Sequence, residues 1–159
     1  DNVFSTPSKK YEFSSELATQ HGHTAIPKFK PPREAYDTYR LLTPHTKFGL
    51  HSQFQNLAWN HDLNPGPFVY IHPKTAAPKR IADGDMVRVF NRVGEVRVKA
   101  SITDNVPADT LLMYEGWFGA KNPYNVNTLV DDTSSDMGKF KTGAPGVALH
   151  DQFAEIEKI

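Results

Sequence analysis

Two neighbouring segments alternate apolar and polar residues with the two-residue period of a half-buried β-strand. In MVRVFN (86–91), Val87 and Val89 fall on one face of the strand and Arg88 falls on the other. In EVRVKASIT (95–103), every second residue from Val96 onward is apolar. The intervening NRVG predicts a tight hairpin, and ADGD directly before the first segment predicts a turn.

Shorter apolar segments predict the other strands of the same domain. They are YRLLTP (39–44), FVYI (68–71), TLLMYE (110–115), GVALH (146–150) and FAEIEKI (153–159). Helices are predicted for SQFQNLAWN (52–60), for PKTAAPKRI (73–81) and for a short segment near Ser14 to Gln20. Six or seven short strands with few helices predict a mainly β domain, and we expect a closed barrel because closure removes exposed strand edges.

The proline-rich start of the chain predicts a different kind of structure. The motif IPKFKPP (26–32) favours extended backbone and disfavours helix. We therefore expect residues 1–35 to be an extended arm or linker from a preceding domain, and residues 36–159 to form the barrel. The first residues, DNVFSTPSKKYEF, include no initiator Met and no signal-peptide pattern, so we expect the chain to be part of a longer protein.

Composition excludes several function classes. Eighteen basic and eighteen acidic residues balance, so no basic excess indicates a nucleic-acid partner. The absence of cysteine excludes disulfides, thiolate metal clusters and thiol chemistry within this chain. No phosphate-binding glycine loop, nucleophile elbow or zinc-protease motif occurs.

The segment LLTPHTKFGLHSQFQN (41–56) gathers neutral hydrogen-bonding side chains and allows three interpretations. An extended backbone would put His45 and His51 on one face, but a metal site would need a third ligand, and none stands in this stretch. A pocket for a polar heteroaromatic ring would use the neutral donors and acceptors, with Lys47 adding a positive charge for a phosphate. Alternatively, a strand is followed by a helix with Ser52 as its N-cap, and the histidines lie at the surface.

A second polar and aromatic segment is YEGWFGAKNPYNVN (114–127). Three aromatic residues, Trp117, Phe118 and Tyr124, could stack on a ring, and Asn125 and Asn127 could hydrogen-bond to it. A packed surface loop, whose turns are fixed by glycine and proline, explains the same residues.

Taken together, these segments resemble the C-terminal molybdopterin-dinucleotide-binding domain of the dimethyl sulfoxide reductase family of molybdopterin oxidoreductases. The resemblance is carried by TPSKKYEFSSE (6–16), LLTPHTKFGLHSQFQN, residues 69–117, VNTL (126–129) and HDQFAEIEK (150–158). The family usually has Gly where Lys9 stands. The resemblance implies a double-psi β-barrel of the aspartate-decarboxylase-like type, with a few short helices.

The resemblance also implies a cofactor, bis(molybdopterin guanine dinucleotide) with molybdenum or tungsten, bound jointly with domains that are missing from this chain. By position, the implied contacts are Thr43, His45, His51, Ser52, Gln53, Asn127 and His150, with Lys47, Trp117, Asn125 and Lys141 as secondary contacts. No residue of this chain is implied as catalytic or as a metal ligand. We therefore expect the chain to be inactive alone and to position and tune the cofactor.

For the parent enzyme, the resemblance implies an anaerobic reductase of S-oxides, N-oxides or similar acceptors. Its implied partners are the remaining domains of the catalytic subunit, an iron–sulfur electron-transfer subunit and a membrane-anchor subunit, with no nucleic acid. The alternative is a stand-alone double-psi barrel that serves as a binding or interaction module. A small barrel enzyme such as a decarboxylase ranks last, because no self-processing Gly-Ser site occurs in the right context.

Overall fold

The computed structural model describes residues 3–29, 38–64, 66–117, 124–132, 134, 146 and 152–159. The chain divides into two units, Asp1–Pro32 and Arg33–Ile159. In the first unit, helix α1 (Glu16–Gln20) confirms the short helix predicted there, and the Ser15 side chain caps it by accepting a hydrogen bond from the Ala18 amide. That this unit is an arm from a preceding domain stays a prediction.

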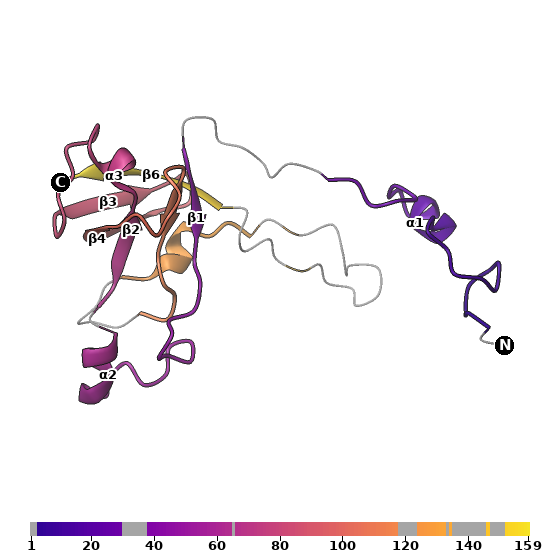
Figure 1. Cartoon of the computed structure of the whole chain (residues 1–159), viewed down its shortest axis with the longest axis horizontal. Helices are drawn as coiled ribbons and strands as arrows, with labels where there is room; N and C mark the ends of the chain where they lie inside the picture. The colour runs from indigo at the N-terminus through magenta and orange to yellow at the C-terminus, as the bar shows by residue number, and fades with distance from the viewer. Residues whose placement is uncertain are drawn as a thin grey trace. The chain divides into compact units, whose positions relative to one another are not determined.

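Six strands of the second unit close into a barrel (Figure 1). Around the barrel the order is β1-β5-β2-β4-β3-β6. The bounds are β1 Tyr39–Leu42, β2 Phe68–Ile71, β3 Met86–Phe90, β4 Glu95–Ile102, β5 Thr110–Leu112 and β6 Gln152–Lys158. The predicted mainly β fold and the closed barrel are confirmed, whereas the double-psi connectivity stays a prediction.

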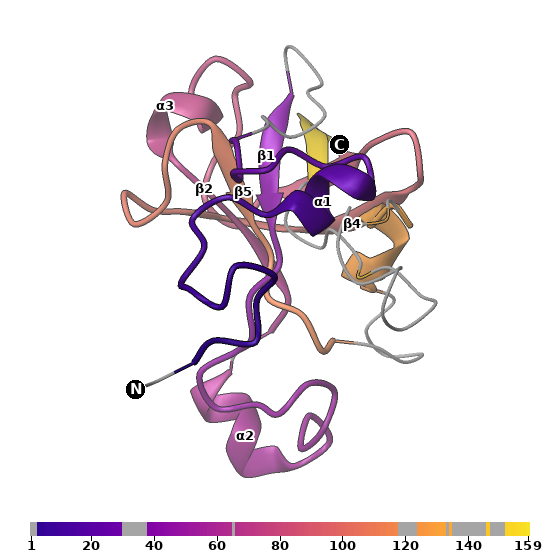
Figure 2. The ribbon, with the colours of Figure 1, turned by 90° about the vertical axis from the view of Figure 1, so that its right-hand side faces the viewer.

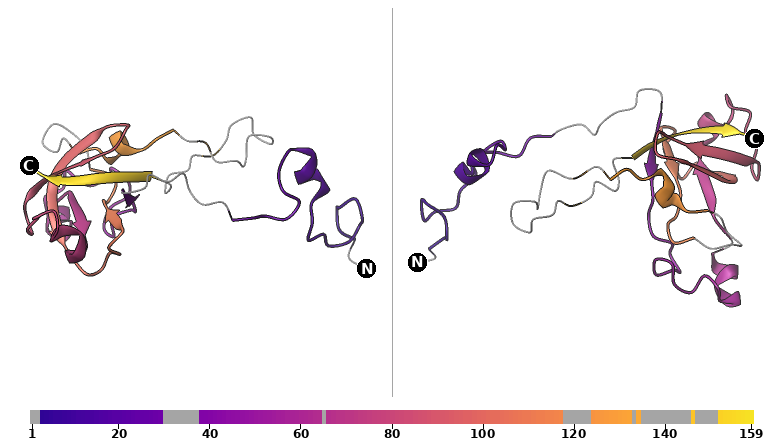
Figure 3. Two further views of the ribbon diagram at one scale, coloured as in Figure 1. Left: turned by 90° about the horizontal axis from the view of Figure 1, so that it is seen from above. Right: turned by 180° about the vertical axis from the view of Figure 1, so that it is seen from behind.

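The alternating patterns fill the barrel interior. Val87 pairs with Val98 and Val89 with Val96 across the antiparallel β3/β4 hairpin, and all four side chains are buried. Strand β6 runs along the other edge of β3 (Figure 3) and adds Ile156 to the same core. Because buried apolar side chains occupy every second position along most of β3 and β4, one face of this hairpin packs inward and the other meets solvent.

The outer face carries an ion network that joins three strands. Arg88 of β3 donates to Glu95 of β4 at 2.7 Å and to Glu157 of β6 at 2.9 Å. The hydrogen bond from Arg88 holds the pKa of Glu95 below its usual range. The alternation predicted at Arg88 is therefore confirmed, with the charge outside and the valines inside.

The helices are shorter than predicted, and one begins elsewhere. Helix α2 spans Ala58–Leu63, so the predicted helix over 52–60 is wrong for its first six residues. His51 and Phe54 have positive φ angles of 50° and 69°, which a helix does not accommodate, and Ser52 is consequently not an N-cap. Helix α3 (Pro73–Ala76) begins where predicted but ends five residues early.

Helices α2 and α3 lie at opposite ends of the barrel (Figure 2), and a short 3₁₀ helix, η1 (Val126–Leu129), contacts β4. The predicted strand at 146–150 lies outside the described residues apart from Gly146, which is not in a strand. Within the described part of the chain, no helix has the length and hydropathy needed to cross a lipid bilayer.

Asn91, in the β3–β4 turn, uses both ends of its amide. Its Oδ1 accepts from the amides of Val93 and Gly94 at 2.8 and 3.2 Å, which shapes the hairpin turn. Its Nδ2 donates to the carbonyl oxygens of Leu129 in η1 and Phe153 in β6, at 2.7 and 3.1 Å. One side chain thus joins the hairpin, η1 and the start of β6.

We expect Asn91→Ala to lower the free energy of unfolding by about 2–4 kcal/mol, because several partly buried partners lose their hydrogen bonds at once. Urea titration followed by circular dichroism measures this. The control is Asn105→Ala, at an exposed position, which we expect to change stability by less than about 0.5 kcal/mol. Equal stability of the two variants would contradict the role assigned to Asn91.

The Asp85 carboxylate links the turn before β3 to the end of β6. Its Oδ2 accepts from Lys158 Nζ at 2.6 Å and from the Ala82 amide at 2.7 Å. These two hydrogen bonds, that from Lys158 first, hold the pKa of Asp85 below its usual range.

Because the folded pKa of Asp85 is lowered, its contribution to stability is present above the unfolded pKa of about 3.9 and is lost as pH falls through the folded value. We expect Asp85→Asn to unfold at a lower temperature than the wild type at pH 6, with the difference shrinking steadily towards pH 2. Thermal unfolding at several pH values measures this. A difference that does not change with pH would contradict it.

Candidate functional site

Two loops leave the same end of the barrel side by side. Strands β1 and β5 pair in parallel, with Leu42 opposite Leu112. The pairing continues past both strands, because the Met113 amide donates to the Leu42 carbonyl at 2.9 Å and the Glu115 amide donates to the Pro44 carbonyl at 3.0 Å. Residues more than sixty positions apart in the sequence therefore meet here.

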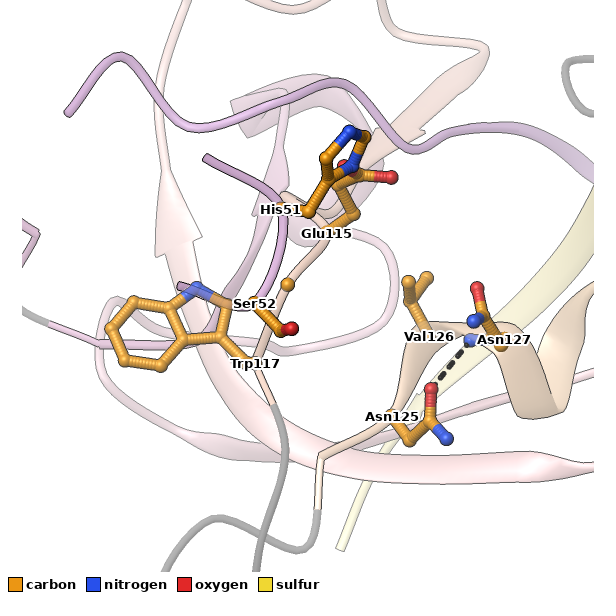
Figure 4. Close-up of a pocket in the computed structure, with 8 residues that line it drawn as sticks. His51, Ser52, Glu115, Trp117, Asn125, Val126 and Asn127 are labelled. Carbon is orange, nitrogen blue, oxygen red and sulfur yellow. Dashed lines mark hydrogen bonds and ion pairs between the residues drawn. The ribbon is translucent and has the colours of Figure 1, made fainter. Parts of the chain in front are cut away.

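These loops and η1 enclose a pocket of about 280 Å³ (Figure 4). Its lining residues are His51, Ser52, Glu115, Gly116, Trp117, Asn125, Val126 and Asn127. Trp117 is only 6% exposed and belongs to the hydrophobic core, so it is a fixed wall of the pocket. Ser52 stands beside it, and Asn125 and Asn127 stand opposite (Figure 4).

The first wall depends on a close approach between two backbones. Gly116 has a φ of 93°, and a Cβ on it would lie 2.1 Å from the carbonyl oxygen of His51. Any side chain at Gly116 would push the His51 loop away, since this oxygen belongs to the backbone and not to a flexible side chain. Next to this contact, the Oε1 atom of Gln55 is buried and has no hydrogen-bond partner among the described residues.

The second wall is η1, which is fixed from several sides. Asn125 caps it, with Oδ1 accepting from the Asn127 amide at 3.1 Å (Figure 4). Gly94 of the hairpin approaches so closely that a Cβ there would lie 2.5 Å from the Thr128 carbonyl oxygen. Before η1, the Tyr124 hydroxyl donates to the Tyr114 carbonyl at 3.0 Å and ties this wall to the extension of β5.

Tyr124 itself does not face a ligand. It is 2% exposed, and burial raises the pKa of its hydroxyl well above the usual range, so the hydroxyl remains a hydrogen-bond donor. The stacking role considered for Tyr124 from the sequence is therefore wrong, and its role is to hold the two pocket walls together.

At the mouth of the pocket, two imidazoles share one carboxylate oxygen. Glu115 Oε1 lies 2.6 Å from His45 Nδ1 and 2.8 Å from His51 Nδ1. The two rings meet edge to face, with centroids 4.8 Å apart. Because an ionised carboxylate only accepts hydrogen bonds, each Nδ1 donates its proton to Glu115 Oε1.

Sequence reasoning missed Glu115. No third ligand lies within 41–56. The fold instead brings the carboxylate of Glu115, three residues after the end of β5, beside both histidines. The available signal was an acidic residue, Glu115, at the end of the strand predicted for 110–115. A single sequence does not indicate that this strand pairs with β1.

The structure gathers five of the predicted cofactor contacts around one pocket. These are His51, Ser52, Trp117, Asn125 and Asn127. His45 joins them through Glu115, and Lys47 lines a neighbouring cavity of about 170 Å³ that shares Trp117. Thr43 and Gln53 line neither cavity, and Lys141 and His150 lie outside the described residues.

Comparisons with known proteins place this fold among molybdopterin proteins. A family model described as "Molydopterin dinucleotide binding domain" matches residues 39–143. The trimethylamine-N-oxide reductase of Haemophilus influenzae is 30% identical over 175 residues, covering 99% of this chain and 21% of that protein. The dimethyl sulfoxide/trimethylamine N-oxide reductase of Cereibacter sphaeroides is also 30% identical, over 174 residues, with the same coverage.

Among solved structures, acetylene hydratase from Pelobacter acetylenicus superposes with a TM-score of 0.78 at 18% identity. The match covers 99% of this chain and 25% of the hydratase, and at this identity it establishes the fold alone. The chain spans about a fifth of the length of the two reductases.

The close approach at Gly116 makes a testable prediction. Gly116→Ala combines an unfavourable positive φ with a backbone collision, so we expect it to destabilise the protein by at least about 2–3 kcal/mol. Gly84→Ala is the matched control, because Gly84 has a φ of 80° but nothing within 4 Å of a Cβ, and it should cost only about 1 kcal/mol. Thermal unfolding measures both, and equal losses would contradict the collision.

Proposed function

The chain belongs to the molydopterin dinucleotide binding domain family, and we propose that its pocket holds the pterin end of that cofactor within a longer oxidoreductase. The membership agrees with the family that the sequence resembles and with the predicted cofactor, bis(molybdopterin guanine dinucleotide) with molybdenum. When bound, this cofactor supplies the redox chemistry. The residues of this chain contribute binding and orientation.

The observation that carries the proposal is the chemistry of the pocket lining. Ser52, Asn125 and Asn127 offer uncharged donors and acceptors beside the fixed indole of Trp117. A pterin presents a pyrimidinone edge of alternating donors and acceptors, and each of these needs a partner once it is buried. The one carboxylate in the lining, Glu115, is hydrogen-bonded to the two histidines, so its charge is partly satisfied within the protein.

One further lining residue supports the same ligand. His51 lines the pocket and contacts Glu115 through Nδ1, so an imidazole adds its hydrogen-bonding capacity to the uncharged side chains there.

The size of the pocket limits how much of the cofactor it holds. At about 280 Å³ it is smaller than the roughly 300–1,000 Å³ typical of pockets that enclose a whole ligand. It therefore accommodates one heterocyclic end, and the rest of the dinucleotide contacts other surfaces. Lys47 lines a neighbouring cavity that shares Trp117, which supports assigning to it a phosphate of the same ligand.

For the whole protein, we propose a reductase of S-oxides, N-oxides or similar acceptors, in which this chain is the C-terminal domain. The proposal is supported by the two reductases that match along almost the entire chain. The remaining domains supply the metal ligand, and an iron–sulfur subunit and a membrane-anchor subunit complete the proposed assembly. Some relatives are named as subunits, including the dimethylsulfide dehydrogenase subunit alpha of Rhodovulum sulfidophilum.

The test is to substitute pocket residues in the full-length enzyme. We expect His51→Ala and Asn127→Ala each to weaken cofactor retention by about 2- to 12-fold, the equivalent of one lost hydrogen bond of about 0.5–1.5 kcal/mol. Molybdenum and pterin contents per protein, measured before and after dialysis, report retention directly.

The matched controls are His23→Ala, in the first unit, and Asn105→Ala, at an exposed site away from this pocket. Both should retain the cofactor like the wild type. Wild-type retention and activity in His51→Ala and Asn127→Ala together would overturn the assignment of the pocket.

A further inference from the structure

We propose that His45, His51 and Glu115 form a binding site for a divalent transition-metal ion of the zinc type at the mouth of the pocket. The ligand atoms are the Nδ1 atoms of the two histidines and a carboxylate oxygen of Glu115. All three atoms lie within 4.8 Å of one another. This site is separate from the molybdenum of the cofactor, and the inference does not rest on the proposed function.

The spacing of the three atoms fits an ion after a small rearrangement. Zinc binds histidine nitrogen and carboxylate oxygen at about 2.0–2.2 Å in a tetrahedral arrangement, which separates neighbouring ligand atoms by about 3.3 Å. The two N···O distances of 2.6 and 2.8 Å therefore have to open by about 0.5–0.7 Å, and the two nitrogens, which lie within 4.8 Å of each other, have to come to about the same 3.3 Å. Both histidine side chains are 66% exposed, so their rings can make this movement without displacing core residues.

The donor set selects the class of metal. Two imidazoles and one carboxylate match the His₂Glu sites of zinc enzymes, which leave a fourth position for water. Imidazole nitrogen favours zinc, copper, nickel and iron, whereas magnesium and calcium prefer oxygen ligands alone. Binding moves each imidazole proton from Nδ1 to Nε2, so neutral histidines can take up the ion with no net proton release.

The backbone holds the ligands near each other before any ion binds. The Glu115 amide donates to the Pro44 carbonyl, which keeps the carboxylate beside the His45 loop. Gly116 packs against the His51 carbonyl, and His51 adopts a positive φ of 50° at that contact. Because these contacts are made by the backbone, the convergence of the three side chains does not depend on the hydrogen bonds that an ion would replace.

The experiment is a titration of the 159-residue chain with Zn²⁺ by calorimetry and with Co²⁺ by visible absorption. The six barrel strands and their buried core lie within this chain, and a cooperative thermal unfolding transition of the wild-type chain is required before the titration. We expect one ion per chain and a Co²⁺ spectrum of the intensity typical of four or five ligands. Circular dichroism and thermal unfolding establish that each variant is folded.

Glu115→Gln and His45→Gln should each weaken metal binding by at least about 10- to 100-fold. Removing a residue that only hydrogen-bonds to a metal ligand already lowers the affinity by this factor, and removing the ligand itself lowers it at least as much. The control is the double variant His21→Gln/His23→Gln, which removes a histidine pair in the first unit that could bind metal adventitiously. It should bind like the wild type.

Three results would overturn the proposal. They are no wild-type binding below about 1 mM Zn²⁺, loss of binding in the His21/His23 variant, and undiminished binding in folded Glu115→Gln. None of the measurements involves the molybdopterin cofactor, so their failure would leave the proposed function standing. Conversely, cofactor retention that does not depend on His51 and Asn127 would leave the metal site standing.

Discussion

The parallel pairing of β1 with β5 is the constraint on which the pocket depends. Parallel strands point their carboxyl ends to the same end of a sheet, so the segments that follow them emerge together. Here the pairing extends two hydrogen bonds beyond the strands, to Pro44 and Glu115. The meeting of Glu115 with His45 and His51 follows from this registration of two distant segments.

The pocket walls are positioned by backbone contacts more than by strong side-chain interactions. Gly116 lies against the His51 carbonyl, and Gly94 lies against the Thr128 carbonyl. At both positions, a close approach of two main chains requires a residue without a Cβ. Asn91 then links the hairpin that carries Gly94 to the end of η1, so the barrel itself fixes the second wall. This arrangement leaves the polar side chains in the lining available to a ligand.

The strands were predictable because each leaves a local signal. Alternation in 86–91 and 95–103 specified which side chains are buried, and the predicted bounds agree with β3 and β4 to within one residue at each end. The helix predicted over 52–60 was wrong for 52–57, where His51 and Phe54 flank or interrupt the segment with positive φ angles and polar residues such as Ser52 and Gln53 fit a turn as well as a helix. The family resemblance was readable from local motifs and is confirmed.

The composition of the site was predictable only in part. His51, Ser52 and Asn127 followed from the resemblance, but Glu115 did not, because its partners are distant in sequence and come close only through β1/β5 pairing. Periodicity within a strand identifies its buried face and carries no information about which other strand lies beside it. Tyr124 was considered for stacking because its ring suits that role, and neither its burial nor its hydrogen bond to Tyr114, ten positions away, appears as a pattern in the sequence.

The fold does not decide the reaction, because a reductase and a hydratase both match almost the whole chain. This chain contributes the hydrogen-bond donors and acceptors that line one pocket. The proposed cofactor site and the proposed metal site share one side chain there, the imidazole of His51. His51 lines the pocket and its Nδ1 also contacts Glu115. An ion bound at Nδ1 would replace that hydrogen bond, and the partner of one ring nitrogen helps to set the orientation of the whole imidazole. Metal occupancy would therefore change how His51 is held at the pocket that we propose for the pterin.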